Sequence, residues 1–219
     1  MSFSVLASER SLMVSQIGLR LVDEFTGAAA LQAVEASLAL RTGAGAWQPL
    51  PIQPVLAPSG TLLYPGLGRS AHVAVAPVVR YRVTLQSSFY RPDYLRTQDA
   101  LEFDIHPYDN EHAPVLAPNL PQTVLLLPSA QYPHAPFMRT LRGITVDSGG
   151  APIPNVEITQ GVAERVLSDE RGVFVLPLRW VAPSGNVVFD AHDHRSGRTD
   201  QLTLTLPHDL RQSQTFTLT

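Results

Sequence analysis

The sequence of 219 residues contains no cysteine and no lysine. Without cysteine, neither disulfides nor thiolate metal sites hold the fold together, so each domain depends on its apolar core. The two absences also remove two common catalytic nucleophiles. Every basic residue is arginine, and two explanations stay open: codon bias in a GC-rich genome, or the use of arginine for bidentate contacts at interfaces.

Charge of either sign is scarce as well. Charged residues make up 16% of the chain, and the formal net charge is −3 at pH 7. Residues 1–130 carry eight arginines against ten acids, and residues 131–219 carry eight against nine. Neither half has the basic excess that nucleic-acid or anionic-membrane binding requires, so we expect no nucleic-acid partner.

Long apolar runs are missing. Residues 1–15 have no basic region, and Glu9-Arg10 interrupts their apolar run, so no secretory signal is expected. No other stretch approaches the length of a membrane span, so we expect no membrane insertion. These features predict a protein that stays in the cytoplasm, leaves it by a leaderless route, or joins a particle assembled there.

Turn-forming residues are abundant, with 19 prolines and 14 glycines. Between Arg142 and Leu178 they separate three short runs with strand character: 144–146, 156–159 and 173–176. Ile144-Thr145-Val146 is β-branched, and Val156 and Ile158 alternate with polar residues, which is the period of a half-buried strand. The sequence therefore predicts an all-β fold.

The same stretch resembles the carboxypeptidase regulatory-like domain, a transthyretin-like or prealbumin-like β-sandwich. The matching residues are Gly143, Val146, Asp147, Gly150, Pro152, Ile153, Asn155, Val156, Ser168, Asp169, Gly172, Phe174 and Gly185. The tyrosine that usually follows the last of these glycines is Asn186 here. The resemblance implies a β-sandwich over residues 138–219 with a non-catalytic, accessory role.

An enzyme with a transthyretin-like fold also exists, a hydrolase of 5-hydroxyisourate. That family uses histidines, an arginine and a Tyr-Arg-Gly-Ser motif at its carboxyl terminus, whereas this sequence ends Gln214-Thr215-Phe216-Thr217-Leu218-Thr219. Serines, histidines and aspartates are plentiful enough for a triad, but no Gly-x-Ser-x-Gly elbow is present. We expect no enzymatic activity, no catalytic residue and no cofactor; a metal-dependent or transthyretin-like hydrolase is the least favoured alternative.

The first half repeats the second in the same order of segments. Residues 21–23 match 145–147, 34–35 match 156–157, 60–65 match 172–177, 83 and 85 match 187 and 189, 101–105 match 202–206, and 122–124 match 214–216. Self-similarity of this kind indicates a duplicated structural unit. We predict two tandem transthyretin-like or immunoglobulin-like β-sandwiches, 17–128 and 138–219, with an amino-terminal arm at 1–16 and a stiff, Pro-rich linker at 129–137.

Local propensity disagrees with this repeat at Ala28–Arg41. The segment is rich in strong helix formers, yet Val34, Ala36, Leu38 and Leu40 alternate with other residues, and the repeat predicts a strand. The connection at 43–59 carries four prolines, at positions 49, 51, 54 and 58, so any strand within it should lie at a sheet edge.

Two clusters contain residue types that bind metals. Asp190, His192 and His194 share one face of a predicted strand, but same-face neighbours lie about 7 Å apart, too far to close on one ion without curling. His106, Asp109, Glu111 and His112 lie on a loop, with spacing that matches no metal motif. We interpret both clusters as solvated surface and predict no metal site.

Aromatic residues offer an alternative function. Trp47, Tyr64, Phe89, Tyr90, Tyr94, Tyr108 and Trp180 are candidates for a carbohydrate platform, although at 7% aromatics we expect most to pack cores, with Trp47 the most exposed. The favoured hypothesis is a non-catalytic structural or adaptor protein that docks onto protein partners in a larger assembly, such as a phage-tail-like contractile injection particle. A carbohydrate- or ligand-binding module is the alternative, and homo-oligomerisation stays open.

Overall fold

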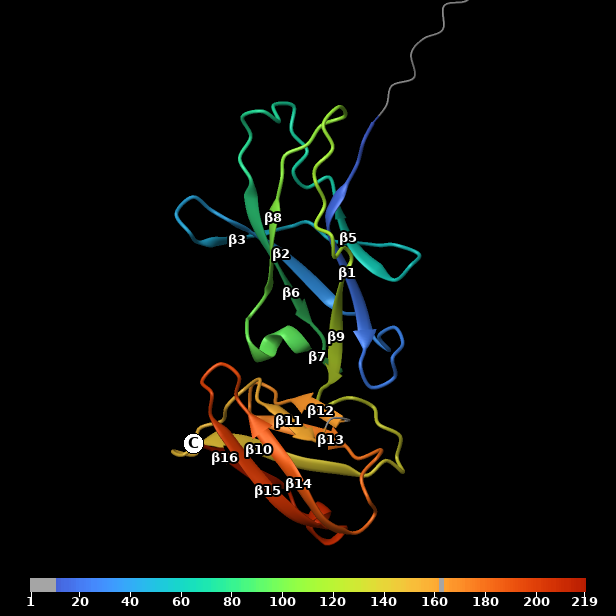
Figure 1. Cartoon of the computed structure of the whole chain (residues 1–219), viewed down its shortest axis with the longest axis vertical. Coiled ribbons are helices and arrows are strands. Elements are labelled where there is room, and N and C mark those ends of the chain that lie inside the picture. The colour runs from blue at the N-terminus through green and yellow to red at the C-terminus, as the bar shows by residue number, and fades with distance from the viewer. Residues whose placement is uncertain (1–10, 162–163) are drawn as a thin grey trace, which may run out of the picture. The chain divides into compact units, whose positions relative to one another are not determined.

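The computed structural model describes residues 11–161 and 164–219, and its regular structure is almost entirely β (Figure 1). The exceptions among these residues are two single turns of 3-10 helix, η1 (Asp93–Arg96) and η2 (His208–Arg211). The prediction of an all-β chain is therefore confirmed. Within the described ranges, no helix is long and apolar enough to cross a membrane.

The strands fall into four sheets. Those of the first half are β1 (Ser15–Asp23), β2 (Glu35–Arg41), β3 (Trp47–Leu50), β4 (Val55–Leu56), β5 (Thr61–Pro65), β6 (Val79–Gln86), β7 (Tyr90–Pro92), β8 (Leu101–Ile105) and β9 (Gln122–Pro128). Those of the second half are β10 (Thr140–Asp147), β11 (Glu157–Gln160), β12 (Glu164–Leu167), β13 (Val173–Pro177), β14 (Gly185–His192), β15 (Thr199–Leu206) and β16 (Gln214–Leu218). The strand orders are β4-β5-β1-β9-β7, β3-β2-β6-β8, β13-β10-β16 and β12-β11-β14-β15.

The two halves share one strand order. The run β5-β1-β9 corresponds to β13-β10-β16, and β3-β2-β6-β8 corresponds to β12-β11-β14-β15. The sequence repeat predicts the same correspondence between the halves: β1 with β10, β2 with β11, β5 with β13, β6 with β14, β8 with β15 and β9 with β16. The additional strands of the first half, β4 and β7, lie at the two edges of their sheet.

Turn chemistry repeats along with the strands. Asp23, at the end of β1, accepts hydrogen bonds on Oδ1 from the backbone N–H groups of Phe25 and Thr26. Asp147, at the end of β10, accepts them from Gly149 and Ala151 in the same manner. A short polar side chain that bonds its own following backbone stabilises a tight turn, so both strands end for the same physical reason.

Two glycines of the family-like stretch are required by packing. A Cβ atom on Gly143 would lie 2.3 Å from the backbone oxygen of Gln214 and 2.7 Å from the ring of Phe174. Gly172 has a φ of +73°, and a Cβ there would lie 2.4 Å from the backbone oxygen of Thr145. Only glycine leaves room for the parallel pairing of β10 with β16 and for the turn into β13.

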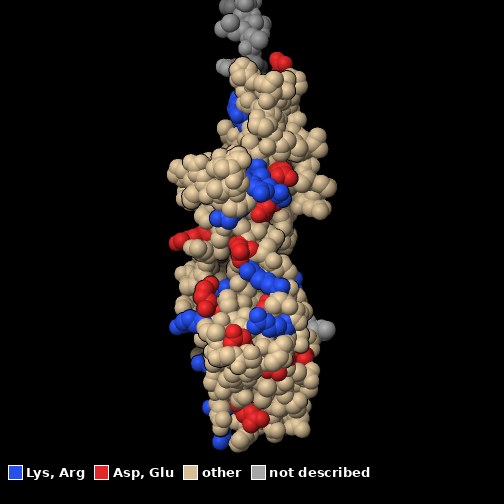
Figure 2. Space-filling view, turned by 90° about the vertical axis from the view of Figure 1, so that its left-hand side faces the viewer, with Lys and Arg blue, Asp and Glu red and all other residues tan. Residues whose placement is uncertain are grey.

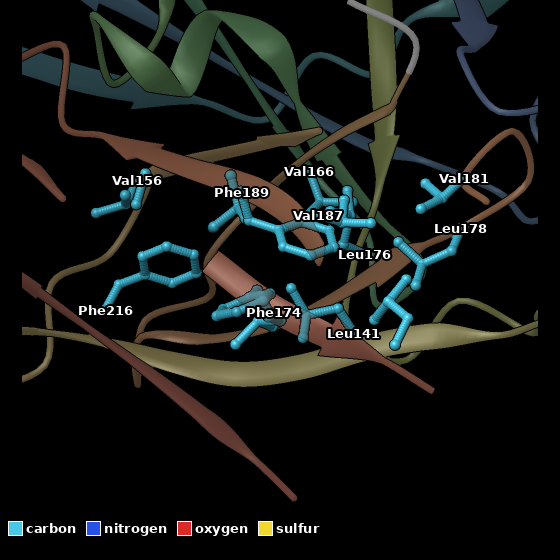
Figure 3. Close-up of a cluster of buried hydrophobic side chains, with 14 of the residues drawn as sticks. Leu141, Val156, Val166, Phe174, Leu176, Leu178, Val181, Val187, Phe189 and Phe216 are labelled. Atoms are coloured by element: carbon cyan, nitrogen blue, oxygen red, sulfur yellow. The ribbon is translucent and has the colours of Figure 1, made fainter. Parts of the chain in front are cut away.

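The core of the second half lies between its two sheets (Figure 3). Phe174, Phe189 and Phe216 are fully buried there, and the ring centroids of Phe174 and Phe216 are 5.7 Å apart. Aliphatic side chains from β10, β11, β12, β13 and β14, and from the residue before β11, surround these rings: Leu141, Val156, Ile158, Val166, Leu176 and Val187. The alternating apolar residues identified in the sequence are thus packed against one another.

The segment Ala28–Arg41 contains a strand and no helix. β2 starts at Glu35, and its side chains alternate, with Ala36 and Leu38 buried between exposed neighbours. The connection after it supplies β3, which contains Pro49, and β4, which follows Pro54. Both are edge strands, as the prolines predict.

The chain divides into two compact units, each assembled from separate segments. The first comprises residues up to Arg20, Ala36–Val83 and Glu102–Thr123; the second comprises Leu21–Glu35, Thr84–Leu101 and Val124–Thr219. Strand β1 begins at Ser15, and residues 1–10 of the predicted arm lie outside the described residues. The predicted domains 17–128 and 138–219 and the linker 129–137 stay predictions.

Candidate interaction site: an arginine seam and an exposed aromatic patch

Arginine side chains connect distant segments within the second unit. Some of them link residues 21–35 and 84–101 to the strands and turns of residues 155–195. We call these the arginine seam: Arg91, Arg96, Arg165, Arg179 and Arg195. Arg91, which is 8% exposed, donates to Oε1 of Glu170 at 2.7 Å and to Oδ1 of Asn155 at 2.5 Å. At the other end, Arg195 lies 2.8 Å from a carboxylate oxygen of Asp99.

Arg179 pairs with a buried carboxylate. Its Nε donates to Oε1 of Glu164 at 2.9 Å and its Nη2 to Oε2 at 3.2 Å, a bidentate geometry. The Glu164 side chain is only 2% exposed. Arg179 also donates to the backbone oxygen of Phe25 and lies 4.0 Å from the centroid of that ring. One guanidinium thus neutralises a buried carboxylate and fixes the Phe25 turn, a combination that lysine does not offer.

Glu157, at the start of β11, is the central carboxylate of the seam. Its Oε1 lies 3.3 Å from Nη1 of Arg96 and 3.2 Å from Nη1 of Arg165, and its Oε2 lies 2.5 Å from Nε2 of His194. Burial acts to raise the pKa of Glu157, but the hydrogen bond from His194 and the charge of Arg96 outweigh it, so the pKa is lowered. Glu157 is therefore held as a paired anion rather than poised as a proton donor or acceptor.

A buried aspartate fixes the predicted linker to β1. Asp23 is fully buried, and its Oδ2 accepts hydrogen bonds from the hydroxyls of Tyr90 at 3.0 Å and Tyr132 at 2.8 Å. Burial, with the nearby charge of Asp23, raises the pKa of Tyr90 to about 12. Both hydroxyls therefore stay protonated donors, and Tyr132 anchors the segment that the sequence predicts as a stiff linker.

The predicted Asp190, His192 and His194 cluster does not converge on one point. The rings of His192 and His194 pack together with centroids 4.0 Å apart, while His194 bonds to Glu157. Asp190 instead accepts a hydrogen bond from Nε2 of Gln201 at 2.7 Å. Each group has a partner of its own, and His194 belongs to the contacts around Glu157.

The second cluster is a turn of the loop after β8. Oδ1 of Asp109 accepts hydrogen bonds from the backbone N–H groups of Glu111 and His112, and Nδ1 of His112 lies 3.0 Å from the same oxygen. The backbone hydrogen bond from His112 lowers the pKa of Asp109. His106 takes no part in these bonds; its backbone groups bond to Gln16. In the described parts of the chain, no group of three or more His, Cys, Asp or Glu residues is placed to hold a metal ion.

The aromatic residues divide between packing and exposure. Tyr64, Tyr90, Tyr94 and Tyr108 are buried, Phe89 is half-buried, and Trp180 is 74% exposed. The expectation that Trp47 is the most exposed ring is wrong, because Trp47 is half-buried with the guanidinium of Arg82 stacked 4.8 Å from its centroid. This shielding could not be predicted, because Arg82 is distant from Trp47 along the chain.

Trp180 has an exposed aromatic neighbour that the sequence prediction missed. Phe137, just before β10, is 86% exposed. Between these segments, Arg139 donates to the backbone oxygens of Val181 at 2.6 Å and Ala182 at 3.1 Å, which ties the two loops together at one end of the second unit. We call Phe137, Arg139 and Trp180 the basic aromatic patch. Exposed rings on an ordered loop are typical of contact surfaces.

The face of the molecule shown in Figure 2 carries no extended field of one sign. On the face shown in Figure 2, positive and negative side chains are interspersed among broad uncharged areas. This agrees with the even distribution of arginines and acids between the two halves of the sequence.

Comparisons with known proteins assign the chain to no family. No family model matches the sequence, and no curated protein matches it. Among solved structures, the chain is similar to the Bacillus anthracis TIE protein (13% identity, TM-score 0.29, 95% of this chain and 33% of that chain). It is also similar to a streptococcal ancillary pilin (12% identity, TM-score 0.33, 97% of this chain and 63% of that chain).

A third similar structure is the pilus adhesin SpaC from Lactobacillus rhamnosus GG in its open conformation (9% identity, TM-score 0.25, 85% of this chain and 27% of that chain). The chain thus spans less than two thirds of the length of each of these proteins.

Proposed function

We propose that this chain is a non-catalytic structural protein that acts as an adaptor on a larger protein assembly. The arginine seam is the observation that carries the proposal. Its charged groups, Glu157, Glu164 and Arg179 among them, hold chain segments together in close ion pairs. Because these groups are paired with one another and losing one partner of a buried pair is destabilising, they serve the structure of the second unit rather than a bound substrate.

The basic aromatic patch supplies the surface through which the adaptor docks. Trp180 and Phe137 project from loops that Arg139 holds in place, so their rings are presented without the entropic cost of ordering a free loop. Tryptophan and arginine are the residues most enriched among those that dominate binding energy. A protein partner that covers both rings would bury the largest exposed aromatic side chains of the second unit.

Two finer points belong to the same proposal. Residues 138–219 would be a carboxypeptidase regulatory-like domain, which the steric need for Gly143 and Gly172 supports. Asn155, another residue of the family-like stretch, has a φ of +60° and bonds to Arg91, so it too has a structural reason to be there. The assembly would be a particle put together in the cytoplasm, such as a phage-tail-like contractile injection particle.

Gel filtration of the tagged chain from its native cells tests the proposal. We expect the chain to elute with a large assembly, and Trp180→Ser to shift it to the size of the free chain, because the patch loses its main apolar contact. The matched control is Val188→Ser, an exposed apolar position on β14, which should leave the elution unchanged. A wild-type chain that elutes free of other proteins would count against an adaptor role.

The exposure of Trp180 also favours a second candidate, recognition of glycans by a stacked ring. The chain has two tryptophans, so Trp47→Phe leaves Trp180 as the sole tryptophan reporter when fluorescence is excited selectively at tryptophan. The adaptor role predicts an unchanged emission spectrum when glycans are titrated into this variant. A saturable change would favour the glycan-binding function instead.

A further inference from the structure

The basic aromatic patch lies on segments with charge of one sign. Residues 130–146 and 173–189 contain Arg139, Arg142 and Arg179 and no aspartate or glutamate. Glu164 neutralises Arg179, whereas Arg139 and Arg142 bond only to backbone or hydroxyl oxygens among the described residues. The exposed rings are therefore accompanied by uncompensated positive charge, and the complementary surface is apolar and acidic.

The first unit presents a surface of this kind. A groove of about 770 Å³ is lined by apolar and acidic side chains, among them Glu102, Phe103, Asp104, Val115, Leu116 and Leu120. We call it the acidic groove. Val115 is 88% exposed and Leu116 is 46% exposed, so the apolar wall of the groove faces solvent. A groove of this volume has room for a tryptophan or phenylalanine ring.

The acids of this groove exceed their cationic partners. Glu102 and Asp104 are the acids of its lining, and no arginine among the described residues lines it. Nε of Arg80 lies 2.9 Å from Glu102 and 3.6 Å from Asp104, so one positive charge serves two carboxylates. The two carboxylate side chains are 41% and 57% exposed, which leaves them free to meet a further cation.

We infer that the basic aromatic patch of one copy docks into the acidic groove of a second copy. This inference rests on the proposed structural role and names the partner as the chain itself. Trp180 and Phe137 supply the apolar contact, and the arginines beside them meet Glu102 and Asp104. Contact between two patches would bring like charges together, which disfavours a patch-to-patch dimer.

The two surfaces differ, so the contact is heterologous. A copy whose patch is occupied still has a free groove, and a copy whose groove is occupied still has a free patch. Further copies can therefore add through the free surfaces. Successive contacts of this kind close into a ring or continue as a filament, and their ion pairs make the association weaker at high ionic strength.

Sedimentation velocity of the full chain tests the inference. We expect the sedimentation coefficient to rise with protein concentration and to fall when salt is added. Trp180→Ser in the patch and Val115→Asp in the groove should each weaken association more than about tenfold. Both positions are largely exposed, so the fold should tolerate both changes. The matched control is Val75→Asp, at a valine that is 82% exposed and outside the groove lining, which should associate like the wild type.

A mixture of the two variants separates this contact from other modes of association. The Trp180→Ser chain keeps an intact groove and the Val115→Asp chain keeps an intact patch, so the mixture should form a dimer that neither variant forms alone. A symmetric dimer through Trp180 would not be recovered in this way. The inference is overturned if the chain is monomeric at every concentration, or if Trp180→Ser associates like the wild type. If the chain is monomeric but Trp180→Ser still dissociates from the native assembly, this inference fails and the adaptor role stands.

Discussion

Phe189→Ala lowers the free energy of unfolding of the second unit by about 3–5 kcal/mol. Phe189 is fully buried between the two sheets and belongs to the same cluster as Phe174 and Phe216. The loss combines the transfer energy of the ring with the cavity it leaves, because β-sheet backbones around the site do not collapse to fill it. With no disulfide in the chain, this core has no covalent support. Urea denaturation followed by circular dichroism measures the effect.

The neighbouring residue provides the control for this prediction. Val188 points to the other face of β14 and is 42% exposed. Val188→Ala should change the free energy of unfolding by about 0.5 kcal/mol, the range of surface substitutions. Equal losses for the two variants would show that burial between the sheets is not what stabilises this half of the chain.

Arg179→Gln lowers the free energy of unfolding by about 3–5 kcal/mol, because it leaves the buried carboxylate of Glu164 without its cation. For a chain of this size, such a loss corresponds to a fall of roughly 6–20 °C in the melting temperature. Differential scanning calorimetry measures that fall. Arg171→Gln is the matched control, since the Arg171 side chain is 74% exposed beside Asp169 and a surface pair of this kind contributes about 0–1 kcal/mol.

A second variant separates the ion pair from simple packing. In the double variant Arg179→Gln with Glu164→Gln, no charge is left unpaired, so part of the lost stability should return. A double variant less stable than Arg179→Gln alone would contradict the account of a buried carboxylate that needs its guanidinium.

Much of the fold could be predicted because strands leave a periodic pattern. Ala36 and Leu38 alternate with exposed neighbours in β2, and the repeat correctly outweighed the helix propensity of Ala28–Arg41. Turns were predictable for a similar reason: Asp147 and Gly172 have local backbone requirements that read directly from the sequence. Proline positions likewise indicated that β3 and β4 lie at sheet edges.

The arginine seam could not be predicted in the same way. Arg165 pairs with Glu24, and Arg91 with Glu170, across long separations in sequence, and ion pairs have no period to detect. The one available signal was the exclusive use of arginine, for which bidentate interface contacts were an open explanation. The bidentate contact of Arg179 with Glu164 supports that explanation.

The exposure of side chains in loops could not be predicted from the sequence either. Trp47 and Trp180 both follow loop-forming sequence. Arg82 covers the ring of Trp47, whereas nothing among the described residues covers Trp180 to the same degree. Which ring is shielded depends on the strand that folds beside it. Phe137 escaped notice because a single phenylalanine after Pro136 is compatible with either burial or exposure.

Native-state hydrogen exchange tests most directly whether the seam joins its segments into one body. The account predicts that the amides of β7–η1, residues 90–96, and those of β11 exchange with the same free energy of opening, and that Arg179→Gln lowers both by the same amount. Loss of protection at residues 90–96 while β11 keeps its protection would contradict it.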